Sequence, residues 1–429
     1  MSRETYSVIR LREAANVEIS GVDKKWSAKE TEVRLCNYVD VYYNWAITRK
    51  GAVNFMKASA NESQIKRFTL KKGQVALTKD SETKYDIGIS AYIADDLDDT
   101  VLGYHCALIT PDETKVNGKY LNAFLHTKFI QRYFELNATG SGQRYALSID
   151  ALNNIPLYLP PMEVQEKVGD LFSKIDRKIE LNQEIYDSLE GMAKLMYDYW
   201  FVQFDFPDSD GRPYRSSGGQ MQWNEGLKRF IPKDWQCRRI LDVASITNES
   251  VNPQNYGEQI MEHYSIPAFD ESGFPRYEAA SSIESNKYVV KKNSILVSKL
   301  NPRFKRIWDP FCETDNAICS TEFIVYSPAD CRYRAFLHAV LNSDAFYIHS
   351  VGGATSSTGS RKRIQPEISA SFKFPYPQDE KVLAKFCDFY DPILQRKKDL
   401  RKENQQLKAM KDWLIPVLMS GQISFTKND

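Results

Sequence analysis

The 429-residue sequence lacks the motifs that would give it an enzymatic chemistry of its own. No GxxxxGK followed by Ser or Thr occurs, which excludes a P-loop ATP motor. An amino-methyltransferase that flips its target base would need an Asn/Asp/Ser-Pro-Pro-aromatic motif and a glycine-rich cofactor turn. The nearest match, Asn301-Pro302-Arg303-Phe304, has arginine in place of the second proline, and no glycine-rich turn follows an expected strand. This segment is better interpreted as a loop that presents Arg303.

Cysteine motifs and long apolar runs are also missing. The seven cysteines form no CxxC pair and no cluster with the five histidines, so neither zinc ligation nor a disulfide framework is predicted. The N-terminus has no signal-peptide core, and no apolar run is long enough to span a bilayer. With 42% hydrophobic and 12% aromatic residues, the chain can build two or three globular domains. We therefore expect a cytoplasmic globular protein without a bound metal.

An internal repeat accounts for most of the chain. The tetrapeptide AFLH occurs at Ala123–His126 and again at Ala335–His338. The segments around it recur in the same order: LKKGQVALTK and VKKNSILVSK upstream, then an Ala-Thr stretch that leads to arginine, a proline-containing apolar run, and EKV. The sequence therefore predicts a duplicated unit, a globular domain followed by a long helix, present twice.

Two long amphipathic helices are predicted, over residues 162–201 and 378–419. Apolar residues recur at alternating spacings of three and four in both, which is typical of a coiled-coil seam. Asn182 and Asn404 interrupt the two seams with a polar side chain, a device that can fix register. Because a whole domain lies between the helices, we expect them to pair antiparallel. The predicted fold class is α+β, with two similar domains joined by two long antiparallel coiled-coil helices around a pseudo-two-fold axis. The expected boundaries are 1–161, 162–201, 202–232, 233–377 and 378–429.

The charge balance is neutral overall but uneven along the chain. With 57 basic and 56 acidic residues the net charge is +1, which argues against a uniformly basic surface. Between Lys287 and Arg306, however, there are seven lysines or arginines and no acid, and residues 361–363 form a second basic cluster. Such residues are candidates for phosphate contacts, because neutralising phosphates releases counterions. A solvated charged face is the alternative. Both clusters lie at corresponding places in the repeated unit, and this favours the interpretation as phosphate contacts.

The segment between the first helix and the second domain, residues 202–235, is rich in Gly, Ser, Pro and Asp but also carries aromatic residues. It is either a loop folded onto its own domain or a docking surface for a partner. Glu82-Thr-Lys84 and Glu113-Thr-Lys115 match the short half of a nuclease motif, but this triplet is common in proteins. His126 and His338 have apolar neighbours and are interpreted as packing residues.

Three features together resemble the specificity subunits of type I restriction-modification enzymes: the alternation of domain and long helix, the prolines before each helix with EKV inside it, and YDYWFVQFDFPDSDGRPYRSSGGQMQWNEGLKRFIPKDW. The resemblance covers essentially the whole chain. It implies two target-recognition domains that each read one half of a split double-stranded DNA sequence. It also implies that the chain is not an enzyme, because separate methyltransferase and restriction subunits supply the chemistry. S-adenosylmethionine, ATP and Mg²⁺ would then be bound by those partners, and this chain would hold no cofactor.

The resemblance also implies positions for the binding residues. Arginine and lysine suit guanine, whereas glutamine and asparagine suit adenine. The residues placed like DNA-facing loops are Thr78, Lys79, Gln143, Arg144, Ser298, Lys299, Asn301, Arg303, Ser360, Arg361, Lys362 and Arg363. The aromatic residues expected to dock the methyltransferase are Trp200, Phe201 and Tyr214. The alternatives are a coiled-coil scaffold without base reading and a metal-dependent nuclease.

Overall fold

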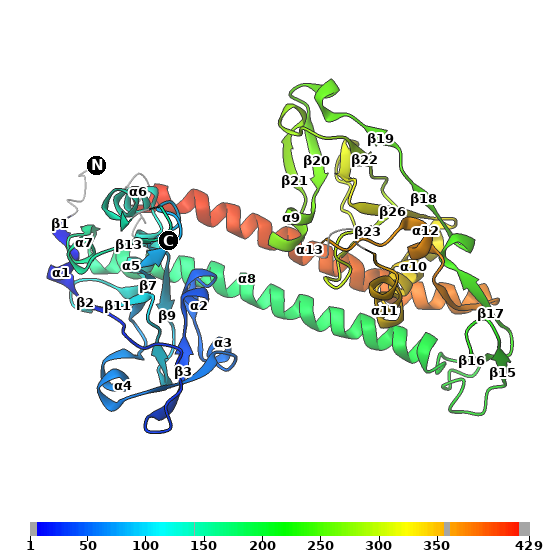
Figure 1. Ribbon diagram of the computed structural model, residues 1–429, viewed down its shortest axis with the longest axis horizontal. Helices are drawn as coiled ribbons and strands as arrows, with labels where there is room; N and C mark the ends of the chain where they lie inside the picture. Colours follow the sequence, from blue (N-terminus) through cyan, green and yellow to red (C-terminus); the bar gives the residue numbers. More distant parts are fainter. Residues whose placement is uncertain (1–6, 141, 356–360, 420–429) are drawn as a thin grey trace. The chain divides into compact units, whose positions relative to one another are not determined.

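The computed structural model describes residues 7–140, 142–355 and 361–419. The chain divides into two compact units, unit 1 with residues 1–180 and 407–429 and unit 2 with residues 181–406. Each unit contains one β-sheet domain and a part of the two long helices α8 (Met162–Tyr197) and α13 (Glu380–Met419) (Figure 1). This architecture confirms the predicted α+β class with two domains joined by two long helices. Across the described residues, no helix is long and apolar enough to cross a membrane.

The first domain contains two main sheets. The five-stranded sheet has the order β2 (Ala15–Ile19), β11 (Cys106–Pro111), β7 (Val75–Thr78), β9 (Ser90–Ile93) and β4 (Ala46–Ile47). The four-stranded sheet has the order β5 (Met56–Ala60), β3 (Thr31–Cys36), β10 (Leu97–Leu102) and β6 (Thr69–Leu70). Smaller ladders join β12 (Thr139–Gly140), β13 (Tyr145–Ala146) and β8 (Asp80–Ser81), and β1 (Ser7–Arg10) with β14 (Pro156–Leu159). The helices are α1 (Leu11–Ala14), α2 (Tyr38–Tyr42), α3 (Arg49–Ala52), α4 (Glu62–Phe68), α5 (Gly118–Leu125), α6 (Lys128–Asn137) and α7 (Ile149–Asn153).

The second domain has the corresponding sheets. One has the order β18 (Ala244–Thr247), β26 (Phe323–Pro328), β23 (Ile295–Ser298) and β24 (Ile307–Trp308). The other has the order β19 (Ser250–Val251), β22 (Lys287–Val289), β25 (Ala317–Ser320), β20 (Ile260–Tyr264) and β21 (Arg276–Ala279). Two ladders join β15 (Met221–Asn224) with β16 (Arg229–Pro232) and β17 (Trp235–Arg239) with β27 (Lys373–Pro377). The α-helices are α9 (Ile266–Glu271), α10 (Arg334–Leu341), α11 (Asp344–Gly352) and α12 (Pro366–Ala370).

The strand topology confirms that the two domains are similar. In each, a central buried strand (β7 or β23) pairs antiparallel with a six-residue strand (β11 or β26). In each second sheet, one parallel pair (β3 with β10, β20 with β25) carries an antiparallel neighbour on either side. The AFLH repeat lies at the end of α5, with His126 as the C-cap, and inside α10; these helices precede α6 and α11. Thr127 and Ser343 cap α6 and α11 in the same way, each accepting a hydrogen bond from the amide three residues on.

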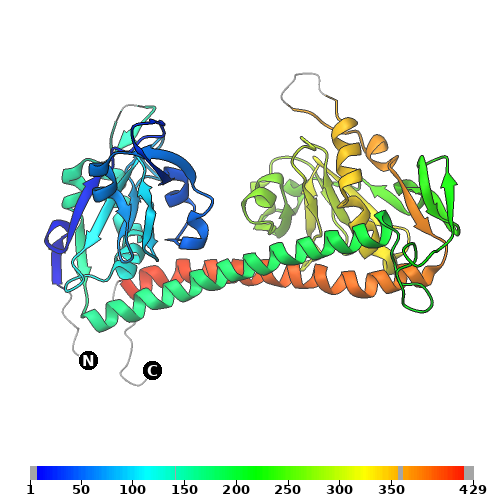
Figure 2. The same ribbon diagram turned by 90° about the horizontal axis from the view of Figure 1, so that it is seen from below.

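In unit 1, the two long helices pack together and against the first domain. Their green and red ribbons lie side by side in Figure 2. On α8, Val168, Phe172 and Ile175 are buried in the same hydrophobic core as Ile415 and Leu418 of α13. Most of the stability of such a helix comes from burying this face rather than from helix propensity.

In unit 2, the predicted polar seam positions meet. The Asn182 side chain is fully buried, and its Nδ2 donates to Asn404 Oδ1 at 2.9 Å and to Glu403 Oε2 at 2.8 Å. A buried amide pairs favourably only in the register that brings this partner opposite it. Asn182 and Asn404 therefore specify how the helices align in this unit.

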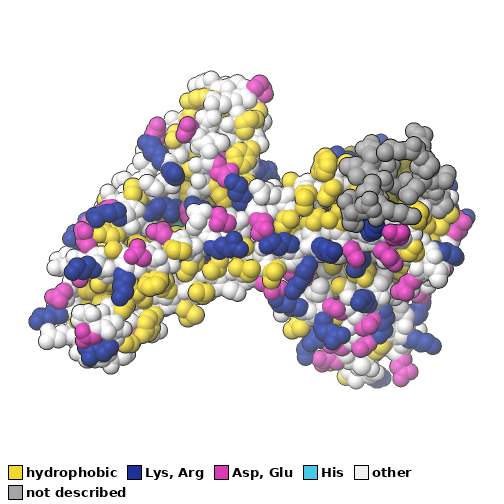
Figure 3. Space-filling model, turned by 180° about the vertical axis from the view of Figure 1, so that it is seen from behind, with side chains coloured by type: hydrophobic (Ala, Val, Ile, Leu, Met, Phe, Trp, Pro, Cys, Tyr) yellow, Lys and Arg dark blue, Asp and Glu magenta, His cyan; other side chains and the backbone are white. Residues whose placement is uncertain are grey.

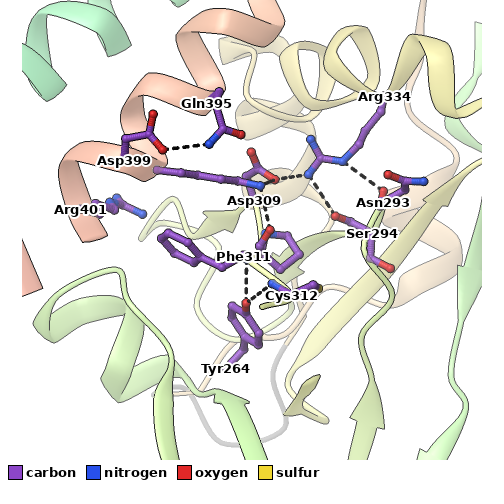
Figure 4. A network of polar contacts seen from close by, with 12 residues as sticks. Tyr264, Asn293, Ser294, Asp309, Phe311, Cys312, Arg334, Gln395, Asp399 and Arg401 are labelled. Carbon is purple, nitrogen blue, oxygen red and sulfur yellow. Dashed lines mark hydrogen bonds and ion pairs between the residues drawn. The ribbon is translucent and has the colours of Figure 1, made fainter. Parts of the chain in front are cut away.

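A buried polar network attaches the second domain to α13 within unit 2 (Figure 4). Asp309 forms ion pairs with Arg334 and with Lys398 of α13, the latter at 2.8 Å. Burial raises the pKa of the Asp309 carboxyl, but the two cations outweigh this effect and hold it below its ordinary value. Close by, Tyr264 Oη accepts hydrogen bonds from the backbone amides of Phe311 (2.7 Å) and Cys312 (3.0 Å).

The two histidines of the repeat are packing residues, as predicted. His126 stacks on Trp45 with a centroid separation of 4.6 Å, and its Nε2 donates to the Ser90 carbonyl at 2.9 Å. Lys411 of α13 lies over the Trp45 ring, with its Nζ 3.9 Å from the ring centroid. Burial lowers the pKa of His126 to about 4. His338 is also buried and lies 3.3 Å from the Tyr390 hydroxyl.

The neutral His126 should make unit 1 sensitive to acid. Its folded pKa of about 4 is below the value of about 6.5 expected in an unfolded chain, so the unfolded state binds a proton first as the pH falls. The associated stability is complete above pH ~6.5 and is lost toward pH ~4, with an upper size of roughly 3 kcal/mol. Asp176, whose pKa burial raises to about 6, acts in the opposite direction.

The thermal midpoints of the wild-type protein and of two histidine variants, measured between pH 6.5 and 4, test this assignment. His126→Gln should flatten the fall in thermal midpoint between pH 6.5 and 4, because glutamine does not titrate there. His349→Gln, at a partly exposed histidine of the second domain, should keep the wild-type fall. Equal pH dependence in all three proteins would contradict the assignment.

Candidate nucleic-acid interface

The second domain brings most of its predicted site residues together on one backbone ladder. The chain leaves β23 at Lys299, and the Lys299 carbonyl accepts a hydrogen bond from the Ile364 amide at 3.1 Å. Leu300 and Arg363 form an antiparallel bridge, and the Asn301 amide donates to the Lys362 carbonyl at 2.7 Å. Segments sixty residues apart in sequence therefore share one surface. Ser360, another predicted site residue, lies outside the described residues.

Arg363 is held by a carboxylate from a neighbouring strand end. Its Nε lies 3.0 Å from Glu322 Oε2, and its Nη2 lies 2.7 Å from Glu322 Oε1. In this side-on pairing, Nε and Nη2 each donate to one carboxylate oxygen. The pairing lowers the pKa of the Glu322 carboxyl, chiefly through the hydrogen bond from Arg363. Lys299 is half-buried beside the pair, over the Tyr288 ring at 5.7 Å. Burial lowers the pKa of Lys299, against the opposing effect of Glu322.

Asn301 has a mainly structural task at this site. Its backbone is left-handed, with φ of 47°, a conformation that asparagine tolerates better than most residues. Its side-chain Oδ1 accepts a hydrogen bond from the Lys362 amide at 3.0 Å. Two-point reading of adenine needs both ends of the side-chain amide, so Oδ1 would have to accept a second hydrogen bond to take part in it. The exposed Arg303 follows, with its guanidinium 4.8 Å from the Phe304 ring centroid.

Two of the three predicted hydroxyl residues are not at the surface. Thr78 is fully buried, and its Oγ1 accepts a hydrogen bond from the Ile89 amide at 3.0 Å. Ser298 is 4% exposed, and its hydroxyl donates to the Leu300 carbonyl at 3.2 Å. Both side chains fix the end of the central strand and cannot reach a ligand in this conformation. Each hydroxyl is the last residue of a strand that is buried at all four of its positions.

The basic run from Lys287 to Arg306 is not one cationic face. Lys287 is buried, with its Nζ 2.7 Å from the Ser285 carbonyl. Arg306 is paired with Asp270 at 2.6 Å, and Lys291 with Glu249 at 3.0 Å. Acids remote in sequence thus pair with Lys291 and Arg306, and Lys287 is buried, a correction to the sequence-based expectation. On the face shown in Figure 3, cationic and anionic side chains are intermingled.

The first domain carries a corresponding cluster at the end of β7. Here the Leu147 amide donates to the Lys79 carbonyl at 2.8 Å, as Ile364 does to Lys299. Lys79 Nζ lies 2.9 Å from Asp80 Oδ1, and Arg144 Nη2 lies 3.3 Å from Asp80 Oδ2. Gln143, also predicted, is exposed next to Arg144.

His105 completes this cluster. Its Nδ1 is 2.9 Å from Asp80 Oδ2 and 2.7 Å from Arg144 Nη2. One ring nitrogen can donate to Asp80 or accept from Arg144, but not both at once. Burial raises the pKa of the Asp80 carboxyl, but hydrogen bonds from His105 and Lys79 outweigh this effect and hold it below its ordinary value.

His105 and Glu322 occupy equivalent backbone positions, and sequence reasoning missed both. The Lys79 amide donates to the His105 carbonyl at 3.0 Å, and the Lys299 amide donates to the Glu322 carbonyl at 2.8 Å. Each of the two side chains then contacts the arginine of its own domain. Aligning the repeats could have paired the two positions, but no local motif marks either residue. Within the described residues, no group of three His, Cys, Asp or Glu side chains could hold a metal ion.

Two of the three predicted docking aromatics lie in the core of unit 2. α8 continues into a π-helical turn at Asp198–Val202. Trp200 is 6% exposed and Phe201 is 1% exposed, and the Phe201 ring packs 4.8 Å from Phe336 and 4.9 Å from Phe386. Tyr214 is partly exposed and stacks on Phe206 at 4.7 Å. The aromatics of this segment are therefore used first for packing onto their own domain.

A cavity of about 600 Å³ remains beside this segment in unit 2. Its wall includes Trp200, Tyr214, Trp235, Asp379 and Lys385. Trp200 and Tyr214 thus keep an edge toward this space although their rings are packed, whereas Phe201 does not line it.

Comparisons with known proteins point to one group of relatives. Residues 4–191 match the family model of the type I restriction modification DNA specificity domain. The type I restriction enzyme HindI specificity subunit of Haemophilus influenzae is 31% identical over 137 residues, which are 32% of this chain and 29% of that protein. The MjaIX specificity subunit of Methanocaldococcus jannaschii is 22% identical over 417 residues, or 95% of this chain and 88% of that protein.

The chain is similar to type I restriction enzyme specificity subunits over almost its whole length, and its residues 4–191 match the DNA specificity domain of that family. The crystal structure of the type I restriction-modification S subunit from M. genitalium has the same fold, with a TM-score of 0.61 at 12% identity over 97% of both chains.

The packing of the central segment predicts the effect of truncating it. Phe201→Ala should destabilise unit 2 by about 3–5 kcal/mol, the usual cost of removing a buried aromatic ring. Tyr214→Ala should cost less, because its ring is partly exposed. Trp223→Ala is the matched control, since this aromatic side chain of the same segment is 50% exposed and should be nearly neutral. Thermal unfolding followed by circular dichroism would measure all three, and an unchanged midpoint in Phe201→Ala would contradict the packing.

Proposed function

We propose that this chain is the DNA-recognition subunit of a type I restriction-modification complex and reads a bipartite duplex sequence, one half with each domain. The observation that carries the proposal is the repeated cluster. In both domains a lysine at the end of the central strand lies beside an arginine brought in by the final ladder. Two similar clusters on one chain suit a target with two separate half-sites.

The chemistry of the clusters supports contacts to both backbone and bases. Lys79, Lys299, Arg361 and Lys362 offer cations for phosphate contacts, which position a protein on a duplex without reading it. Arg144 and Arg363 offer planar donor groups that suit base edges in the major groove. Neither cluster contains the groups needed for strand cleavage or methyl transfer, so we propose that partner subunits supply this chemistry.

The proposed assembly contains two methyltransferase subunits, one for each half of the repeated chain, and restriction subunits. S-adenosylmethionine, ATP and Mg²⁺ would be bound by these partners. The edges of Trp200 and Tyr214 at the 600 Å³ cavity are candidates for one of the contacts. We place the complex in the cytoplasm, where its DNA substrate lies.

Mapping methylated bases in DNA modified by the full complex tests the function. The expected product is methylation within a fixed pair of short sequences at constant separation. Methylation without a sequence pattern would favour a coiled-coil scaffold that organises partners but reads no bases. Metal-dependent cutting by the isolated chain would instead favour a nuclease.

The salt dependence of binding tests the phosphate contacts. Arg361 and Lys362 are both exposed beside Arg363. Replacing both with alanine should weaken DNA binding and reduce the slope of log K against log salt by about 1–2, because fewer counterions are released. A matched variant with Lys228→Ala and Lys233→Ala makes the same change of charge at exposed sites of the central segment. If both double variants show the wild-type slope, the 361–362 cluster does not contact phosphate.

A further inference from the structure

Glu322 occupies an unexpected place for an acid, because it lies inside the cationic cluster of the second domain. Its carboxylate faces Arg363 and is close enough to Lys299 and Arg361 for their charges to affect its titration. A carboxylate repels phosphate, so it weakens a surface whose task is only to bind the DNA backbone. Its presence therefore indicates another task for the arginine that it holds.

The hydrogen bonds of Arg363 define that task. A guanidinium offers two two-donor edges, a side-on edge of Nε and Nη2 and an end-on edge of Nη1 and Nη2. Glu322 occupies the side-on edge, with contacts of 3.0 Å from Nε and 2.7 Å from Nη2. The end-on edge is left for a ligand, and 42% of the Arg363 side chain is exposed. A pair of parallel donors matches the O6 and N7 acceptors of guanine in the major groove.

The backbone around Arg363 limits its movement as well. Arg363 exchanges hydrogen bonds with Thr355, at 2.8 Å through its own amide and at 3.0 Å through its carbonyl. On the other side, its neighbours Lys362 and Ile364 bond to the segment Lys299–Asn301. Arg363 is thus fixed at both its backbone and its side-on edge. A group fixed before binding loses less conformational entropy when it reads a base.

We infer that Glu322 is a positioning residue that holds Arg363 so that its end-on edge reads one guanine in the half-site of the second domain. The inference rests on the proposed function, because it specifies how that function discriminates bases. It assigns Glu322 no contact with DNA.

The first domain supplies an internal comparison. Arg144 meets Asp80 and His105 through Nη2, at 3.3 Å and 2.7 Å. Neither contact is the two-point pairing through Nε and Nη2 that Glu322 makes with Arg363. Arg144 is therefore oriented less firmly than Arg363, and the two half-sites should differ in how strictly they require guanine.

The test uses the full chain in complex with its methyltransferase partner and a duplex library with randomised half-sites. Arg363→Lys keeps the charge but removes the two-donor edge. It should lower discrimination at one G·C pair of one half-site by roughly 5- to 150-fold, the range for a two-point base contact. Arg239→Lys, the same change at an exposed arginine that pairs with Asp242 outside the cluster, should leave that preference intact. Thermal midpoints establish that each variant is folded.

Glu322→Gln separates positioning from a direct or purely structural role. It should lower discrimination at the same base pair, while affinity for mismatched duplexes stays equal or rises because an acid near phosphate is removed. Glu367→Gln, which removes an exposed acid near Lys299 that makes no contact with Arg363, should leave discrimination unchanged.

Two results would overturn the inference while the proposed function stands. One is that Arg363→Lys weakens all duplexes equally, which would make Arg363 a phosphate contact. The other is that Glu322→Gln leaves every base preference unchanged, which would make the pair an ordinary surface ion pair. A wild-type complex without any sequence preference would instead remove the proposed function and the inference together.

Discussion

The surface proposed for DNA binding depends on one backbone hydrogen bond in each domain. The carbonyl of the lysine after the central strand accepts it from an apolar residue just before the last short helix, Leu147 in one domain and Ile364 in the other. Both apolar side chains are buried, which fixes the register of the ladder. The ladder places the neighbouring arginine beside the lysine, although more than sixty residues separate them. Without this backbone ladder, the lysine and the arginine of each domain would lie on separate loops.

Contacts with the two long helices also stabilise the domains, by apolar packing in unit 1 and by polar contacts in unit 2. In unit 1, apolar residues of α8 and α13 complete the core below the first domain, together with the stacked Trp45 and His126. In unit 2, the polar pair of Asn182 and Asn404 and the ion pairs of Asp309 set the alignment. Buried polar groups are costly when unpaired, so these contacts favour one arrangement over its neighbours. A rigid support of this kind lets surface loops carry the recognition residues.

Much of this organisation was predictable from local patterns. The seam spacing predicted both long helices and the asparagines in them, and the repeated AFLH segments predicted two similar domains. The strand-end lysines and the arginines after them were also identified, because they recur in order around the repeat. The partners of these residues were not predictable. Asp270, Glu249 and Glu322 come from distant segments, and no local signal shows that they neutralise or orient particular cations.

By itself, the sequence determined the duplicated architecture, the apolar faces of the helices and the type of residue offered at each strand end. The helix faces and strand ends follow from patterns over a few residues, and the duplication follows from whole segments that recur in the same order. Tertiary structure decided which of those residues are accessible. It buries Thr78, Ser298 and Phe201, leaves Arg363 exposed, and places His105 and Glu322 at matching positions. The reason is physical: burial and charge pairing are set by chain segments that meet only after folding, so they cannot be read from any one stretch of sequence.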